Sequence, residues 1–230
     1  MSNDKNQYRI KIIKNGPYFV SGGVPLLEKI IVPKGNEYEY TEGRKLPQAE
    51  EYSLCRCGKS KTQPFCDCTH EEENFIGTET ASREKYIDRA ILIEGHDVDI
   101  LDDHRCSLAR FCHQQDGTVW GLLKYSQNEK YKKQVVQGSC DCPSGRLTVV
   151  DKNGNLMEPE YEPAIYIVQD PEKQVSSSLC VRGGIPIESS DGHIYEVRNR
   201  LTLCRCGESR NKPFCDAAHI SVGFSDSNQR

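Results

Sequence analysis

The sequence predicts an α+β, β-rich fold built from three small domains, and three observations lead to this prediction. A cysteine-rich motif occurs twice, the segments around each copy are short and extended with Gly and Pro between them, and a segment with a different pattern separates the copies. Hydrophobic residues make up only 36% of the 230 residues, and charged residues make up 28%. Small cores of this composition would be marginally stable, so the twelve cysteines are candidates for additional stabilisation.

The duplicated motif reads LCRCGKSKTQPFCDCTH from Leu54 and LCRCGESRNKPFCDAAH from Leu203. The likeness extends upstream, where YFVSGGVPL from Tyr18 matches LCVRGGIPI from Leu179. Strands are predicted for the extended segments QYRIKII, PYFVSGG and IIVPKG. We therefore predict a first module over residues 1–84, a central domain over 85–170 and a second module over 171–230.

The central segment has a mixed α+β pattern. A hairpin is predicted for AILIEG and DVDIL, and further strands about an Asn-Gly turn for RLTVVDKNGNLM with AIYIV. A helix is predicted around Asn128 to Val136. This segment is therefore expected to fold as a domain inserted between the two modules.

Charge and hydropathy limit the cellular compartments and the binding partners that can be expected for this chain. The N-terminus has no apolar run of signal-peptide length, and no stretch approaches the roughly 20 apolar residues that cross a bilayer. We expect a cytoplasmic, reducing compartment, where closely spaced cysteines are metal or redox ligands rather than disulfides, and no membrane association. The net charge of -4 argues against nucleic acid as a partner, because such binding needs a basic face.

Each copy of the motif offers three cysteines and one histidine at the spacing C-x-C-x8-C-x3-H. The C-x3-H step predicts that Cys and His lie on one helix face, with Asp67 and Asp216 as N-caps. Structural zinc sites usually space their cysteines C-x2-4-C, so the spacing favours another metal, with a Cys3His zinc site as the alternative. The candidate ligands are Cys55, Cys57, Cys66 and His70 in the first copy and Cys204, Cys206, Cys215 and His219 in the second.

Both motifs resemble the CDGSH, or NEET-type, iron-sulfur signature. The supporting positions of that signature are occupied by Ser60, Pro64 and Phe65, and by Ser209, Pro213 and Phe214. The glycine and serine of the family name are replaced by Cys68-Thr69 and by Ala217-Ala218, while every ligand position is retained. The resemblance implies two 2Fe-2S clusters. It also implies that the two modules pair as an intramolecular pseudo-dimer in a monomer, with a homodimer of like modules as the alternative.

The central segment carries CSLARFC from Cys106 and CDCPSG from Cys140. These elements resemble the divergent single-cluster ferredoxin-like domain, with Ala109 where a middle cysteine would stand. The resemblance implies a 3Fe-4S cluster, or a 4Fe-4S cluster with one non-cysteine ligand, on Cys106, Cys112 and Cys142. Cys140 or His113 could add a ligand, and a zinc site or reduced buried cysteines are the alternatives.

The predicted clusters favour electron transfer between redox partner proteins. Delivery of clusters to apo iron-sulfur acceptors, or redox and pH sensing through labile histidine-ligated clusters, is the second hypothesis, and a structural zinc protein is the third. The sequence shows no nucleophile-base pair, phosphate loop or cofactor fingerprint, so we expect no catalysis by this chain alone.

Overall fold

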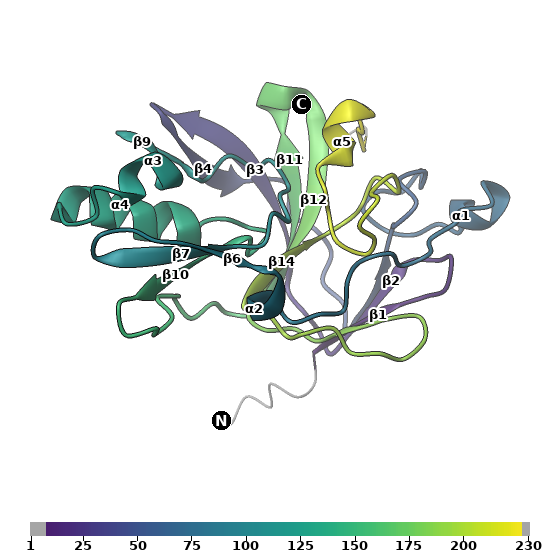
Figure 1. Cartoon of the computed structure of the whole chain (residues 1–230). Coiled ribbons are helices and arrows are strands. Elements are labelled where there is room, and N and C mark those ends of the chain that lie inside the picture. Colours follow the sequence, from purple (N-terminus) through teal and green to yellow (C-terminus); the bar gives the residue numbers. More distant parts are fainter. Residues whose placement is uncertain (1–7, 227–230) are drawn as a thin grey trace, which may run out of the picture.

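The computed structural model describes residues 8–226, and two β-sheets form its framework. Figure 1 shows helices α3 (Val119–Leu123) and α4 (Glu129–Cys140) at one end of the molecule and α1 (Thr69–Glu72) at the other. Strands are more numerous than helices over these residues, and the helices are short. The predicted β-rich character is confirmed.

The first sheet has the order β13-β1-β2-β5. Buried and more exposed residues alternate along its strands, as expected for a sheet with one face on the core. Its strands are β1 (Arg9–Ile12), β2 (Tyr18–Ser21), β5 (Glu51–Leu54) and β13 (Ile187–Glu188).

The second sheet has the order β14-β12-β11-β3-β4. Its middle strands β11 and β12 are buried along nearly their whole length, which explains their apolar and small residues. Its strands are β3 (Leu26–Lys34), β4 (Glu37–Glu42), β11 (Ala164–Asp170), β12 (Val175–Arg182) and β14 (Arg200–Leu203).

The two sheets exchange strands between the sequence modules. In the first sheet, Ile187 of β13 pairs in parallel with Ile10 of β1. In the second sheet, Leu26 of β3 pairs in parallel with Ile165 of β11. Leu26 and Ile187 are equivalent positions of the repeat, so each module contributes the same strand to the sheet of the other.

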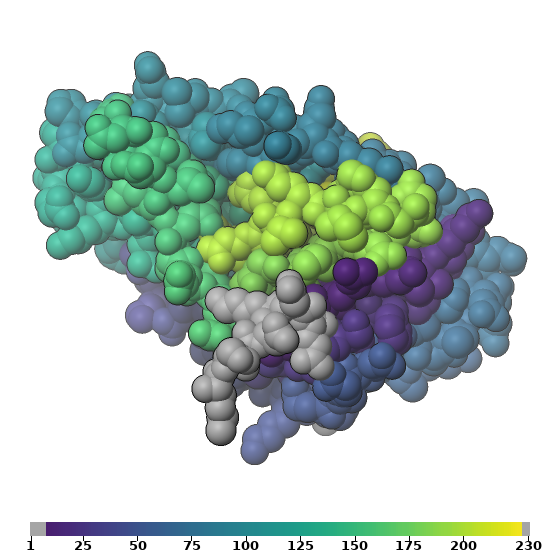
Figure 2. Space-filling model, turned by 90° about the horizontal axis from the view of Figure 1, so that it is seen from below, coloured from purple at the N-terminus to yellow at the C-terminus, as the bar shows by residue number. Residues whose placement is uncertain are grey.

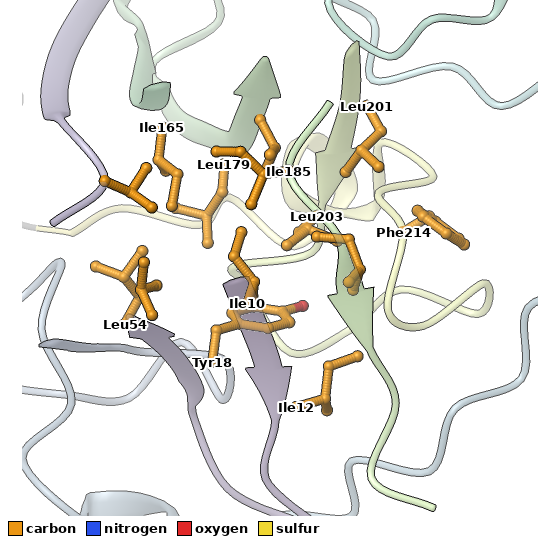
Figure 3. Close-up of a cluster of buried hydrophobic side chains, with 14 of the residues drawn as sticks. Ile10, Ile12, Tyr18, Leu54, Ile165, Leu179, Ile185, Leu201, Leu203 and Phe214 are labelled. Carbon is orange, nitrogen blue, oxygen red and sulfur yellow. The ribbon is translucent and has the colours of Figure 1, made fainter. Parts of the chain in front are cut away.

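The largest hydrophobic core lies between these sheets. Figure 3 shows Ile10, Tyr18 and Leu54 of the first sheet facing Ile165 and Leu179 of the second. All five side chains are almost completely buried. The Tyr18 hydroxyl donates to the backbone oxygens of two residues in the second motif, Cys204 at 2.8 Å and Pro213 at 3.2 Å. This core therefore ties the second motif to strand β2 of the first module.

The central segment forms its own three-stranded sheet, β10-β7-β6, with the predicted hairpin between β6 (Ile91–Ile93) and β7 (Val98–Asp102). Strand β10 (Leu147–Asp151) pairs with β7, and α3 and α4 pack against this sheet through a second hydrophobic cluster. Helix α4 confirms the predicted helix and extends it to Cys140. The shorter elements are α2 (Tyr86–Arg89), β8 (His113–Gln114), β9 (Gly117–Thr118), the 3-10 turn η1 (Pro171–Lys173) and α5 (Ala218–Ser221).

The strand predicted from AIYIV exists as β11, but its placement in the central domain is wrong. Instead of joining β10, this strand pairs with β3 and β12 in the second sheet, because both of its faces are buried there. Seen from below, part of the second module lies between the teal and green central segment and the purple N-terminal strands (Figure 2). Among residues 8–226, no helix is long and apolar enough to span a bilayer.

Replacement of Ile165 by alanine tests the role of the strand exchange. Ile165 of the second sheet is 0% exposed and lies in the core shared with the first sheet, so we expect Ile165→Ala to lower the free energy of unfolding by about 2–5 kcal/mol. Denaturant titration of the apo protein measures this change. The control Ile87→Ala removes a side chain that is 59% exposed and should change stability by no more than about 0.5 kcal/mol. Equal effects of the two changes would contradict the described core.

Candidate metal centres

The first candidate site begins where β5 ends. The backbone N-H of Cys55 donates to the Pro64 carbonyl at 2.8 Å, and that of Cys66 donates to the Ser53 carbonyl at 2.9 Å. These two bonds fold the loop back on the strand, so the third cysteine returns beside the first. Phe65 also forms a bridge with Leu54.

The second site repeats this arrangement at the end of β14. Cys204 donates to the Pro213 carbonyl at 2.7 Å, and Cys215 donates to the Thr202 carbonyl at 2.9 Å. Phe214 forms the bridge with Leu203. The two loops are therefore the same local structure, each built on the last strand of a different sheet.

Side chains of the motif fix both loops in the same way. The Ser60 hydroxyl donates to the Phe65 carbonyl at 2.6 Å, and Asp67 accepts the N-H groups of Lys61 at 2.7 Å and Thr69 at 3.1 Å. Ser209 and Asp216 make the corresponding bonds in the second loop. These serine and aspartate positions thus hold the ligand loop in shape.

The prediction that Cys and His share a helix face is wrong. Helices α1 and α5 begin only after Cys68 and Ala217, which are in the left-handed conformation with φ of 69° and 68°. This turn separates Cys66 and Cys215 from the helices that carry the histidines. The N-cap positions are Cys68 and Ala217, so Asp67 and Asp216 lie one residue before the N-cap, from where each accepts the first N-H of its helix. A glycine adopts positive φ without strain, which explains why the family name has one here. Cys68 itself is exposed.

In each module the four candidate ligands form two close pairs. Two cysteine sulfurs of the C-x-C step make one pair, and the third sulfur and the histidine Nδ1 make the other. The separations are 3.7 Å for Cys55 with Cys57, 3.7 Å for Cys204 with Cys206, 3.4 Å for Cys66 with His70 and 3.5 Å for Cys215 with His219.

These separations fit two tetrahedral metal ions per module. With bonds of about 2.3 Å to sulfur and 2.0 Å to nitrogen, two sulfurs on one tetrahedral metal lie about 3.8 Å apart, and a sulfur and a nitrogen about 3.5 Å apart. Over the described part of the chain, no group of three or more His, Cys, Asp or Glu side chains is placed to hold one metal ion. The donors therefore suit a two-iron cluster better than the single zinc ion considered from the spacing.

The C-x-C pairs are prepared for metal binding by their own hydrogen bond. This bond lowers the pKa of the Cys55 thiol to about 6 and that of Cys204 to about 7, while it raises the pKa of Cys57 and of Cys206. Thiolate is the ligand form of cysteine, so Cys55 and Cys204 are the first thiols of their pairs to become available for metal binding as the pH rises.

The two histidines have different surroundings. The His70 side chain is 12% exposed, and its Nε2 lies 3.9 Å from a carboxylate oxygen of Glu71. His219 is only 2% exposed, and its Nε2 lies 3.3 Å from the Ser177 hydroxyl. Burial lowers the pKa of His219 to about 4. The second histidine therefore stays neutral, and able to bind metal, well into the acidic range.

The central cysteines come from three places in the inserted segment. Cys106 lies in the loop after β7, Cys112 before β8, and Cys142 after α4. Burial, together with negative charge on Cys142 and Cys106, raises the pKa of Cys112 to about 12, and Cys112 packs against the hydrophobic cluster that contains Cys142. The Cys140 thiol instead donates to the Met157 carbonyl at 3.2 Å, and His113 is exposed.

The loop that holds Cys106 has an unusual backbone. His104, Leu108 and Arg110 all have positive φ, between 54° and 68°. Left-handed residues within a loop turn N-H groups toward a common centre, as in many phosphate and iron-sulfur sites. The Leu108 N-H lies 3.3 Å from the Cys106 sulfur, in keeping with such a site.

The three ligand sets are neighbours. Cys106 and Cys215 line one surface cleft, and negative charge on Cys106 adds to the burial that raises the pKa of Cys215. On the other side of the second site, a Cβ on Gly58 would lie 2.5 Å from the Cys206 oxygen. In return, a Cβ on Gly207 would lie 2.5 Å from the Cys57 oxygen. The second motif thus contacts both the central site and the first motif.

Comparison with known proteins agrees with this arrangement. A family model described as an iron-binding zinc finger of CDGSH type matches residues 15–71 and 176–220. A model described as a divergent 4Fe-4S mono-cluster matches residues 93–152. Comparisons with curated proteins and with solved structures gave no match. The chain therefore contains two segments of the CDGSH type with a segment of the divergent 4Fe-4S mono-cluster type between them.

Three polar residues near the ligands were not predicted from the sequence. They are Arg56 and Arg205, which stand between the cysteines of each C-x-C step and are buried, and Ser177 on β12. An arginine inside both copies of C-x-C was a visible signal in the repeat. The position of Ser177 beside a histidine 42 residues later had no local signal.

Replacement of the histidine ligands by cysteine tests the ligand assignment. Two ferric ions, two sulfides and three thiolates carry a net charge of about -1, and a fourth thiolate would make it about -2. We expect His70→Cys and His219→Cys to retain a visible cluster and to lower its midpoint potential by roughly 100 mV or more. Rieske centres, in which two histidines replace two cysteines, have reduction potentials higher than those of plant-type ferredoxins by several times this amount. Voltammetry measures the potential, and an unchanged midpoint would refute the assignment.

Acidification should release the first cluster before the second. His219 stays neutral to about pH 4, whereas solvent reaches the His70 side chain, and protons compete with metal for the ring nitrogen. Visible absorbance during an acid titration of wild type should therefore fall in two steps. His70→Cys should remove or shift the step at higher pH and leave the other unchanged. Loss of the His219 cluster first would contradict the described burial.

Proposed function

We propose that this iron-sulfur protein transfers electrons, with 2Fe-2S clusters on the two Cys3His sets and a third cluster on Cys106, Cys112 and Cys142. The observation that supports this proposal is the row of ligand sets. Cys106 shares a cleft with Cys215, and the C-x-C turn of the second motif contacts that of the first. Neighbouring sites of this kind suit passage of electrons along the chain between redox partner proteins.

The clusters, when bound, would supply one-electron redox chemistry. The residues of the chain hold and shield them. Buried Cys55, Cys57, Cys204 and Cys206 would bind the inner metal of each pair, and the more accessible Cys66 and His70 would bind the outer metal of the first site. We propose no catalytic role for the chain beyond this transfer.

The pairing of the motifs supports an internal pseudo-dimer. Each module gives one strand to the sheet of the other, and the two C-x-C-G turns meet reciprocally. Both relations are what a two-fold axis between the modules would produce. We therefore propose a monomer in solution, in which the two modules of one chain pair as two separate chains would in a homodimer.

The central site supports a cluster with three cysteine ligands. Ala109 is buried and takes the place of a fourth thiol in the C-x5-C loop, and Cys140 is directed to Met157. We propose a 4Fe-4S cluster with one non-cysteine ligand, or a 3Fe-4S cluster. The family match to a 4Fe-4S mono-cluster supports the first form.

A second candidate function is cluster delivery from the first site. The Cys66 thiol and the His70 side chain are less buried than their counterparts Cys215 and His219. An acceptor protein could reach this outer pair of ligands more easily. The same exposure would make the first site responsive to pH.

Rapid mixing of the reduced protein with an oxidised ferredoxin-type acceptor separates the two functions. Electron transfer predicts fast reoxidation with iron and sulfide retained on this chain. The control is Cys112→Ser, which alters the central site and leaves both Cys3His sets intact. Slow reoxidation together with migration of iron and sulfide to an apo acceptor would reject electron transfer in favour of delivery, and zinc without sulfide would reject both.

A further inference from the structure

The equivalence of the two modules continues beyond the histidines. The N-H of Phe75 donates to the His70 carbonyl at 3.0 Å, and that of Phe224 donates to the His219 carbonyl at 2.9 Å. These rings lie against the buried arginines of the C-x-C steps, each 5.3 Å from the guanidinium carbon. The first pair is Phe75 with Arg56 and the second is Phe224 with Arg205.

Two residues after each phenylalanine the modules differ. The first has Gly77, whose N-H donates to the Asn15 side chain at 3.1 Å. The second has Asp226, whose N-H donates to the Ser176 hydroxyl, also at 3.1 Å. Asn15 and Ser176 are equivalent in the repeat, so Gly77 and Asp226 occupy the same place beside the buried arginine.

This difference changes the charge beside each site. Arg205 donates to the Asp226 carboxylate, and both side chains are 0% exposed. Gln169 at 2.9 Å and Ser176 at 3.0 Å also donate to that carboxylate and hold it in place. Arg44 lies 3.9 Å away and has its own closer partner in Glu28, at 3.0 Å. The cation at the second site is therefore neutralised.

Arg56 has no such partner. Its Nε donates to the Gly16 carbonyl at 2.8 Å and its Nη2 to the Ile13 carbonyl at 3.3 Å. Within residues 8–226 no carboxylate lies within 4.0 Å of it, whereas Arg205 has the Asp226 carboxylate. A Cβ on Gly77 would lie 2.1 Å from Nη2, so the guanidinium fills the space that an aspartate would need. The first site keeps an unneutralised cation.

The outer ring nitrogens differ in a related way. Ser177 lies beside His219 Nε2 in the second module, and the equivalent residue of the first module is Gly16. A Cβ added to Gly16 would lie 3.4 Å from His70 Nε2, so the two positions stand in the same relation to their histidines. With a metal on Nδ1, the neutral ring of His219 would carry its proton on Nε2, which would donate a hydrogen bond to the Ser177 hydroxyl. A hydrogen bond from the outer nitrogen makes a histidine ligand more electron-donating. The first site lacks this serine, and the exposed Glu71 carboxylate lies 3.9 Å from His70 Nε2, beyond hydrogen-bond distance.

We propose that Asp226 and Ser177 give the second CDGSH site a lower reduction potential than the first, so that electrons pass from the second site to the first. A neutralised cation and a more basic histidine both favour the oxidised state, whereas Arg56 favours the more negative reduced state of the first site. The proposal rests on the proposed function, because both sites must hold clusters. Asp226, Ser177 and Arg56 act as positioning and charge-setting residues and are not ligands.

An EPR-monitored redox titration of the intact protein tests this polarity. We expect the two 2Fe-2S signals to appear at different potentials, with at least a tenfold difference in reduced-to-oxidised ratio, which is about 59 mV for one electron. Ser177→Gly should raise the lower midpoint, and Asp226→Asn should raise the lower midpoint by more than the higher one, because the charge of Arg205 also reaches Cys55 of the first site. Arg56→Gln should lower only the higher midpoint. The control Glu188→Gln removes a carboxylate of the same module that pairs with Arg9 and Lys11 at the surface, and should move neither.

Coincident midpoints in the wild type would overturn the proposal, as would a larger shift of the higher midpoint than of the lower one in Asp226→Asn. If the Asp226→Asn protein does not bind the second cluster, the midpoints of Ser177→Gly test the proposal instead. Glycine is the residue that the first module has at this position of the repeat, so this change is expected to be tolerated. Distinct midpoints without transfer to any oxidised acceptor would instead refute the proposed electron transfer and leave the inequality of the sites standing.

Discussion

The close approach of the two C-x-C-G turns is the constraint on which the arrangement of this protein depends. Gly58 and Gly207 have φ of 76° and 83°, and neither has room for a Cβ against the backbone of the opposite turn. The turns can meet only because both copies have glycine there. This contact brings the two cysteine pairs together, and the strand exchange that accompanies it builds one core from residues of both modules.

The inserted segment uses the same framework. It leaves the first module after α1 and returns to the second sheet through β11, and between these points it carries its own sheet and helices. Its ligand loop follows β7 and meets the second motif at the cleft shared by Cys106 and Cys215. The second module therefore occupies the middle of the row, which is why a difference in charge at Asp226 could affect the order in which the sites are reduced.

Much of the site followed from the sequence, because a repeated motif with constant spacing encodes its local structure directly. Ser60, Asp67 and their counterparts make the same bonds in both copies, as equal spacing implies. The helix start was misjudged because only the backbone shows the left-handed turn at Cys68. The exchange of β3 and β13, and the place of β11, depend on parallel pairing between distant segments, which local periodicity does not encode. The equivalence of Asp226 and Gly77 rests on hydrogen bonds beyond the motif, where the two sequences no longer resemble each other.

Anomalous X-ray diffraction from crystals of the intact protein, measured at the iron and zinc edges, tests the central claim most directly. We expect iron in two pairs, one at each Cys3His set, with one metal of each pair between the two cysteines of the C-x-C step and the other between the third cysteine and the histidine. We also expect a separate group of irons at Cys106, Cys112 and Cys142. A single zinc peak equidistant from all four ligands of a motif would contradict the assignment of two-iron clusters.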